Sequence, residues 1–332
     1  MSADFRALGL AVGHATDIEG ATGVTVVRGL DTPLRAAATV FGRAAGTREL
    51  TTLAVDHLVD RIDALMLTGG SAYGLDAAAG VMRWMEERGR GFTVPGGVVP
   101  IVPAAVIFDL APLGRFDARP TAAMAYDACD AAEPNEIAEG SIGAGTGATV
   151  GKIAGPSRAM KGGIGCALEN NGAWQVGAIA VVNALGDVRD AGGTIIAGAR
   201  ADEGPSGSRR FIDAMRQLAT VGAPESRLGA RFGAEVPTNT TLCVVATDAP
   251  LGRVELTQLA RAAGAALFRR ITPTGTSVDG DVVFALAPPV PAAPLGSATM
   301  AIEALAIAAL EEAIERAVRT ARGRDGVPGL AD

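Results

Sequence analysis

Thr240 is the residue of this sequence whose position offers nucleophilic chemistry. It stands in the segment Thr238-Asn239-Thr240-Thr241, directly before a run rich in β-branched residues. A threonine at a chain start carries a hydroxyl next to an α-amine, and that amine, with an ordinary pKa of about 7.7–8.0, can act as a base near pH 7. An internal threonine gains this amine only if the peptide bond before it is cut. By itself, the segment also fits an ordinary junction between a turn and a strand.

A substitute base is needed because histidine is scarce. The two histidines are His14 and His57. Residues 69–74 (Gly-Gly-Ser-Ala-Tyr-Gly) resemble a nucleophile elbow, but position 73 is tyrosine instead of glycine, and the α/β-hydrolase order requires a histidine after the serine. Two isolated histidines also disfavour a histidine-based metal site, and we predict neither a metal nor another cofactor.

Two nucleotide-binding patterns fail on inspection. Residues 143–148 (Gly-Ala-Gly-Thr-Gly-Ala) fit the dinucleotide pattern, but residues 136–140 before them do not form a buried strand. Lys152 follows Gly151 as in a phosphate loop, yet position 146 is threonine where that loop needs glycine, and Ile153 replaces the required serine or threonine. We therefore predict no nucleotide site.

The composition describes a large, acidic globular chain. Of its 332 residues, 48% are hydrophobic and 20% are charged, which is ample for a sizeable core. The net charge is −7 and basic residues form no stripe, so nucleic-acid binding is not expected. The first residues lack the pattern of a signal peptide, and no apolar run reaches the roughly 18–20 residues of a membrane helix. The sequence predicts a soluble, cytoplasmic protein without a membrane partner.

Hydrophobic patterning predicts strands that alternate with alanine-rich helices. The elements that must position Thr240 form one mixed α/β domain, because the chain shows neither an internal repeat nor a clean linker. We expect strands at residues 24–27, 62–67, 176–183, 241–247 and 282–286, and helices at 75–87, 256–268 and 299–322.

Several sequence blocks together resemble one enzyme family. The chain is similar to the self-processing aminopeptidases, which include the L-aminopeptidase/D-esterase, the β-peptidyl aminopeptidases and the endo-type 6-aminohexanoate-oligomer (nylon-oligomer) hydrolases. The matching blocks follow the family's order over most of the chain, at residues 12–17, 67–75, 99–109, 143–152, 161–165, 239–248 and 279–281.

The resemblance assigns roles to individual residues. It implies that Thr240 is the nucleophile, released by cleavage after Asn239. Asp279 and Asp281, 39 and 41 residues further on, match a pair of aspartates in the nylon-oligomer branch, whereas the peptidase branch is similar to a Ser/Glu pair. Residues two apart in an extended segment face the same side, so both carboxylates are expected to orient the amine or hydroxyl of Thr240. Asn183 resembles the family's side-chain donor to the oxyanion.

Two further residues are implied with less support from their surroundings. Lys161 resembles the family's active-site lysine, which would lower the pKa of the amine or donate a hydrogen bond; a solvated loop lysine is the alternative. Tyr126 is a candidate for a tyrosine lining the substrate pocket, but it lies outside a clear motif, and its surroundings favour a core position.

The resemblance also implies a fold and an assembly. The expected fold is a four-layer αββα sandwich of the N-terminal-nucleophile type. A single catalytic domain, residues 1–332, would be processed into an α chain, residues 1–239, and a β chain, residues 240–332, and four αβ units would form a homotetramer.

The substrate stays open at this point. The combination of Thr240, Asp279 and Asp281 favours linear ω-amino-acid oligomers of the nylon type or short peptides. The alternative is an aminopeptidase acting on L-amino-acid amides, short peptides or β-peptides. The ornithine acetyltransferases, which share this kind of self-cut threonine, are a competing acyl-transfer family. The cleavage block of that family is not found in this sequence. An unprocessed binding protein of the same fold is the alternative of another class.

Overall fold

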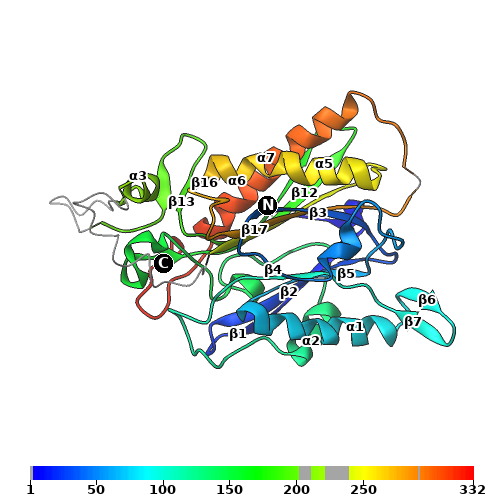
Figure 1. Ribbon diagram of the computed structural model, residues 1–332, viewed down its shortest axis with the longest axis horizontal. Coiled ribbons are helices and arrows are strands. Elements are labelled where there is room, and N and C mark those ends of the chain that lie inside the picture. Colours follow the sequence, from blue (N-terminus) through cyan, green and yellow to red (C-terminus); the bar gives the residue numbers. More distant parts are fainter. Residues whose placement is uncertain (1–2, 202–210, 221–238, 291) are drawn as a thin grey trace.

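The computed structural model describes residues 3–201, 211–220, 239–290 and 292–332. Two five-stranded sheets pack face to face, and helices cover the outer face of each sheet, so the molecule has four layers in the order α, β, β, α (Figure 1). Two sheets that are both covered on their outer faces bury their strands almost completely, which explains why strand sequences such as residues 241–247 are apolar without alternation.

The first sheet has the strand order β1-β2-β5-β8-β4. Its neighbours are antiparallel except for the parallel pair β5 and β8. The outer face is covered by α1 and α2, which pack against β1, β2 and β5 through a small apolar cluster. The bounds are β1 (Leu10–Asp17), β2 (Thr22–Gly29), β4 (Gly46–Arg48), β5 (Ala64–Thr68), β8 (Ala104–Val106), α1 (Ala78–Glu86) and α2 (Ala122–Asp130).

The second sheet has the strand order β11-β12-β15-β17-β3. Here β15 and β17 are parallel, while the other neighbours are antiparallel. The outer face packs against α5, α6 and the long helix α7. The bounds are β3 (Arg35–Gly42), β11 (Gly163–Asn170), β12 (Gln175–Asn183), β15 (Thr240–Thr247), β17 (Gly280–Ala287), α5 (Arg253–Ala263), α6 (Ala265–Arg270) and α7 (Ala298–Arg319).

Short elements connect the layers. The two-stranded pairs are β6 (Phe92–Val94) with β7 (Gly97–Val99), and β9 (Thr149–Val150) with β10 (Met160–Lys161); a third small sheet joins β13 (Asp187–Arg189), β14 (Ile195–Ala197) and β16 (Ile271–Thr272). The remaining described elements are α3 (Ala214–Leu218) and the 3-10 helices η1 (Arg6–Leu8), η2 (Leu50–Leu53), η3 (Ser71–Ala77), η4 (Gly143–Gly145), η5 (Lys152–Ala154) and η6 (Pro156–Arg158).

The topology brings three strand ends together at one edge of the second sheet. Because β15 and β17 run parallel, their first residues lie side by side, and the bridge between Asn239 and Asp279 lies just before both strands. The antiparallel neighbour β12 ends at the same edge, where Asn183 is opposite Thr240. The fold therefore gathers residues that are up to about a hundred positions apart in the sequence.

Helix α5 and helix α6 replace the single helix expected over residues 256–268. The break falls at Gly264, where an added Cβ would lie 2.2 Å from Cζ of Phe41. Phe41 is at the end of β3 and packs against the cluster beneath these helices. The absence of a side chain at Gly264 lets the Phe41 ring pack closely where the two helices meet.

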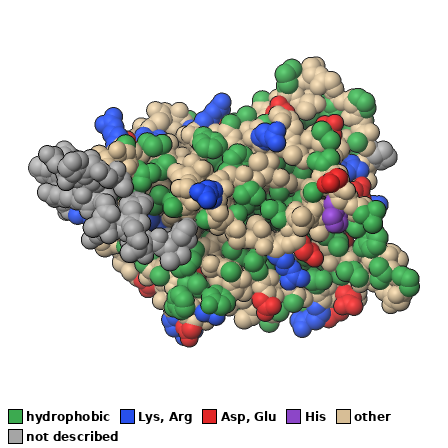
Figure 2. Space-filling view, in the orientation of Figure 1, with side chains coloured by type: hydrophobic (Ala, Val, Ile, Leu, Met, Phe, Trp, Pro, Cys, Tyr) green, Lys and Arg blue, Asp and Glu red, His purple; other side chains and the backbone are tan. Residues whose placement is uncertain are grey.

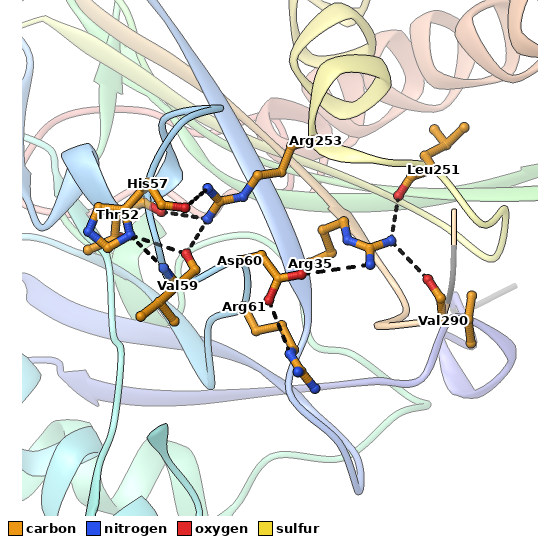
Figure 3. Close-up of polar contacts among 9 residues, drawn as sticks. All are labelled: Arg35, Thr52, His57, Val59, Asp60, Arg61, Leu251, Arg253 and Val290. Carbon is orange, nitrogen blue, oxygen red and sulfur yellow. Dashed lines mark hydrogen bonds and ion pairs between the residues drawn. The ribbon is translucent and has the colours of Figure 1, made fainter. Parts of the chain in front are cut away.

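Two arginines, Arg35 on β3 and Arg253 on α5, contact the loop between β4 and β5 and so join the second sheet and its helices to the first sheet (Figure 3). Arg253, the first residue of α5, donates to the carbonyl oxygens of Thr52, Ala54, His57 and Val59. Arg35 on β3 donates to the carbonyl oxygens of Leu251 and Val290, and its guanidinium lies 3.9 Å from the carboxylate of Asp60. Backbone carbonyls of an irregular loop are thereby satisfied by side chains.

Replacing Arg253 by methionine should lower the free energy of unfolding by about 2 kcal/mol, because hydrogen bonds to a charged donor contribute roughly 1.5–3 kcal/mol and partial rehydration of the carbonyls offsets part of the loss. The measurement is urea denaturation followed by circular dichroism. The exposed Arg261 on the same helix gives the matched control, and Arg261→Met should change stability by less than about 0.5 kcal/mol. Equal losses in both variants would contradict the role of the Arg253 contacts.

The surface carries mixed charge. On the face seen in Figure 2, basic and acidic side chains are both scattered among apolar and uncharged ones. Within the described residues, no helix is both long enough and apolar enough to cross a membrane.

Candidate active site

The peptide bond between Asn239 and Thr240 is buried at the start of β15. Both residues are 5% exposed. The Thr240 hydroxyl donates to the Asn239 carbonyl oxygen at 2.6 Å, and the backbone N–H of Gly280 donates to the same oxygen at 2.9 Å. The hydroxyl therefore lies beside the carbonyl group that the sequence predicts it to attack.

Asn183 lies next to Thr240 because the last residue of β12 pairs with the first residue of β15. Its side chain is fully buried and makes hydrogen bonds through both ends of the amide. The oxygen Oδ1 accepts from the backbone N–H of Thr149 and from Nζ of Lys152, both at 3.0 Å, and Nδ2 donates to the Phe108 carbonyl oxygen at 3.1 Å. These bonds orient the amide nitrogen and oxygen and join both sheets at the site.

The two aspartates lie one on each side of Gly280 and are both 2% exposed. Asp279 accepts from the backbone N–H and the hydroxyl of Thr276. Asp281 accepts at 2.6 Å from the backbone N–H of Thr241, the residue that follows Thr240. Burial, and then the charge of Asp279, raise the pKa of Asp281 to about 6. Both aspartates lie beside the start of β15, and their orientation of the amine or hydroxyl of Thr240 stays a prediction.

Lys152 is the residue of this site that sequence reasoning missed. Its Nζ donates to both the carbonyl oxygen and Oδ1 of Asn183, each at 3.0 Å. Burial lowers the pKa of the amine to about 7, against the opposing attraction of Asp279, Asp281 and Asp109. A lysine with this pKa is partly neutral at physiological pH, which is what a general base requires.

Lys161 is the residue that the resemblance assigned as the lysine of the site. It is fully buried on β10, and its Nζ donates to the carbonyl oxygens of Thr146 and Ala148 at 2.8 and 2.7 Å. Burial, and then the charge of Arg324, lower the pKa of this amine to about 7 as well. The structure thus places Lys161 behind the 146–149 backbone, while Lys152 contacts Asn183.

A signal for both lysines was present in the sequence. The chain has 29 lysine and arginine residues, and only these two are lysines. Arginine cannot lose its proton at physiological pH, whereas a buried lysine can. A chain that uses arginine for its other strongly basic side chains, and buries Lys161 fully and Lys152 partly, points to positions where a titratable amine is used.

Asp109 belongs to the same buried neighbourhood. It accepts from the Thr22 hydroxyl at 2.8 Å and from the backbone N–H of Gly70 at 2.6 Å. Burial raises the pKa of this carboxyl to about 6, with a smaller opposing effect from Lys161. Asp109 ties the end of β5 to the segment after β8, and its neighbour Phe108 accepts the hydrogen bond of Asn183.

Tyr126 is not brought to this cluster. It lies on α2, where its hydroxyl donates to Glu87 at 2.6 Å and Arg83 lies over its ring. Because α2 covers the outer face of the first sheet, the ring packs in the outer apolar cluster and not between the sheets. The structure thus favours the core position over the substrate-pocket position for Tyr126.

No group of three or more His, Cys, Asp or Glu side chains within the described ranges is arranged to hold a metal ion. The chemistry available at the site is that of a hydroxyl nucleophile, a lysine amine of lowered pKa, a side-chain amide and two buried carboxylates. This set matches the requirements of acyl transfer: a nucleophile, a base and donors for an oxyanion.

The chain is similar to known proteins over most of its length. The family model described as "Peptidase family S58" matches residues 7–331. The chain is 40% identical to a protein of Mycobacterium tuberculosis called an uncharacterized aminopeptidase, over 98% of this chain and 95% of that protein. It is 30% identical to the 6-aminohexanoate-oligomer endohydrolase of an Agromyces species, over 84% of this chain and 72% of that protein.

A solved structure shares the architecture. The L-aminopeptidase D-Ala-esterase/amidase from Ochrobactrum anthropi, described as a variant of the N-terminal-nucleophile hydrolase fold, superposes with a TM-score of 0.72 at 20% sequence identity, over 100% of this chain and 92% of that one. The predicted fold class, an αββα sandwich of the N-terminal-nucleophile type, is confirmed by this likeness and by the four layers.

Proposed function

The chain belongs to peptidase family S58, and from that premise we propose that it is a self-cleaving amide hydrolase whose nucleophile is Thr240. The observation that carries the proposal is the hydroxyl of Thr240 held 2.6 Å from the carbonyl oxygen of Asn239. Asn183 is paired opposite Thr240, and Lys152 contacts Asn183. Membership of a peptidase family supports the reaction class, and the buried hydroxyl beside the Asn239 carbonyl supports Thr240 as the nucleophile.

The first stage is maturation. An intact chain has no α-amine at Thr240, so another base is required. The neutral amine of Lys152 takes the proton of the Thr240 hydroxyl as Oγ1 adds to the Asn239 carbonyl carbon. The tetrahedral oxyanion collapses, the C–N bond breaks, and the leaving nitrogen takes the proton from Lys152. Water hydrolyses the resulting ester to give the Asn239 carboxylate and a free α-amine and hydroxyl on Thr240.

The second stage is turnover. The α-amine of Thr240 takes the hydroxyl proton while Oγ1 adds to a substrate amide, and the side-chain amide of Asn183 stabilises the oxyanion. The amine product leaves with the proton, and water then hydrolyses the acyl ester and restores the hydroxyl. Asp281 holds the backbone N–H of Thr241 and so fixes the position of the nucleophile.

The substrates proposed are linear ω-amino-acid oligomers or short peptides. The similarity to a 6-aminohexanoate-oligomer endohydrolase and the threonine with two aspartates support the first class, and the aminopeptidase relatives support L-amino-acid amides, short peptides and β-peptides as the alternative. Side-by-side assays of amino-acid amides, β-dipeptides and 6-aminohexanoate oligomers decide between them. A cytoplasmic homotetramer of αβ units stays a prediction from the family resemblance.

The purified wild-type protein should give two bands on denaturing electrophoresis. At about 100 Da per residue, from 33.4 kDa over 332 residues, chains of 239 and 93 residues have masses of about 24 and 9 kDa. N-terminal sequencing of the smaller chain should read Thr-Thr-Leu-Cys-Val. A hydrolytically active preparation that contains only the full-length chain would refute self-cleavage, and a full-length chain without hydrolysis would favour an unprocessed binding protein.

A further inference from the structure

We infer that the backbone N–H of Gly280 stabilises the oxyanion of self-cleavage, so that maturation and turnover draw on different donors. The inference deepens the proposed function and rests on it. The N–H of Gly280 already donates to the Asn239 carbonyl oxygen at 2.9 Å in the uncut chain. This is the oxygen that becomes negatively charged when Thr240 adds to the carbonyl carbon.

The second hydrogen bond to that oxygen does not survive the reaction. The Thr240 hydroxyl donates to the Asn239 oxygen before attack, but it gives up its proton when Oγ1 forms the new bond to carbon. The Gly280 N–H remains, and its bond strengthens as charge develops on the oxygen. Because Asn239, Thr240 and Gly280 are all buried, this dipole acts in a site of low dielectric constant, where such donors have their largest effect.

The peptide group that carries this N–H is held from its other side. The carbonyl oxygen of Asp279, in the same peptide plane, accepts from the backbone N–H groups of Arg43 and Ala44, both at 2.9 Å. Two glycines permit this close approach: a Cβ on Gly42 would lie 2.3 Å from the Asp279 oxygen, and a Cβ on Gly280 would lie 2.6 Å from the Ala44 oxygen. The donor is therefore oriented before the reaction begins, as an oxyanion donor must be.

Asn183 is engaged elsewhere in the uncut chain. Its Nδ2 donates to the Phe108 carbonyl oxygen, and its Oδ1 faces the Lys152 amine and the Thr149 N–H. These contacts hold Asn183 beside the nucleophile, where it can serve a substrate after the cut. Two groups on different strands thus serve as donors. The N–H of Gly280 on β17 donates to the carbonyl of the cleavage site, and the side-chain amide of Asn183 on β12 is the donor proposed for substrates.

The test removes the Gly280 N–H without adding a side chain. Glycolic acid at position 280 replaces the peptide bond by an ester, and the same replacement at Gly172, in the exposed turn between β11 and β12, is the matched control. Self-cleavage is followed by electrophoresis after cell-free synthesis. We expect the 280 ester to cut about 10²–10³-fold more slowly than the wild type, the usual effect of losing one oxyanion donor, and the 172 ester to cut at the wild-type rate.

A two-chain form separates maturation from folding and from turnover. Residues 1–239 are coexpressed with residues 240–332 begun directly at Thr240, so that no cut is needed. In the two-chain form, the 280 ester should reduce the rate of substrate hydrolysis relative to the wild type. That reduction should be far smaller than the reduction in the self-cleavage rate that the same ester causes in the single chain. Wild-type cutting by the 280 ester, or equal losses in the two forms, would overturn the inference. Failure of the wild type itself to cut would instead overturn the proposed function.

Discussion

Thr240→Ala should yield one uncut chain of 33.4 kDa without amide hydrolysis, whereas Thr240→Ser should retain both the cut and the activity. Alanine removes the oxygen that forms the acyl bond in both stages, and serine keeps it. Loss of a nucleophile costs more than about 10⁴-fold in rate, so the variant should be indistinguishable from background. Electrophoresis measures the cut, and release of amine from the preferred substrate measures turnover.

The neighbouring threonine supplies the matched control. The hydroxyl of Thr241 is buried and makes no hydrogen bond among the described residues, so Thr241→Val removes it at nearly constant volume. The backbone N–H of Thr241, which Asp281 holds, is unchanged by this substitution. Thr241→Val should therefore cut and hydrolyse as the wild type does. Cutting by Thr240→Ala, or its loss in Thr241→Val, would place the nucleophile elsewhere.

Lys152→Met should slow self-cleavage by about 10²–10⁴-fold, the usual contribution of a general base. In the wild type the base acts only when its amine is neutral, and burial sets the pKa of that amine at about 7. The rate of cutting should therefore rise with pH up to about 7 and level off above it, and at pH 5 it should be roughly a hundredfold below the plateau. Pulse-labelled chain is transferred to buffers of different pH, and the rate of self-cleavage is measured at each pH. In Lys152→Met this rate should not rise between pH 5 and pH 7.

Two companion variants decide which lysine is the base. Lys152→Arg keeps the positive charge near Asp279 and Asp281 but cannot release a proton, so it should fail to cut. Lys161→Met should keep the rising limb of the pH profile, because Lys161 donates to the carbonyl oxygens of Thr146 and Ala148. If Lys161→Met removes the limb and Lys152→Met keeps it, the assignment that the resemblance gave to Lys161 is correct.

The strands and helices that contain long hydrophobic runs could be predicted from the sequence. The expected strands at residues 176–183 and 241–247 and the helix at 299–322 correspond to β12, β15 and α7. Strands β1 and β3 and helix α2 were missed, because their small and polar residues hide the burial pattern. Periodicity also gave one helix where Gly264 separates α5 from α6. The ring that packs against this glycine, Phe41, comes from a strand more than 200 residues away.

The site was predicted in part, and for an identifiable physical reason. Thr240, Asn183, Asp279 and Asp281 stand at strand ends that the topology brings to one edge, so family blocks and strand patterns both led to them. Lys152 ends the family block at residues 143–152, but the residue pattern there indicates no more than an incomplete phosphate loop. Its role depends on burial and on the contact with Asn183, and neither is visible until the chain is folded.

The position of β15 and β17 between β12 and β3 has a thermodynamic consequence for the cut protein. Two strands of the 240–332 chain then lie inside a sheet whose outer strands belong to the 1–239 chain. Unfolding changes from a reaction of one molecule into a dissociation of two, so the melting temperature becomes dependent on protein concentration and refolding becomes second order. Exchange of isotope-labelled fragments between native molecules should be as slow as global unfolding, because neither chain can leave without opening the sheet.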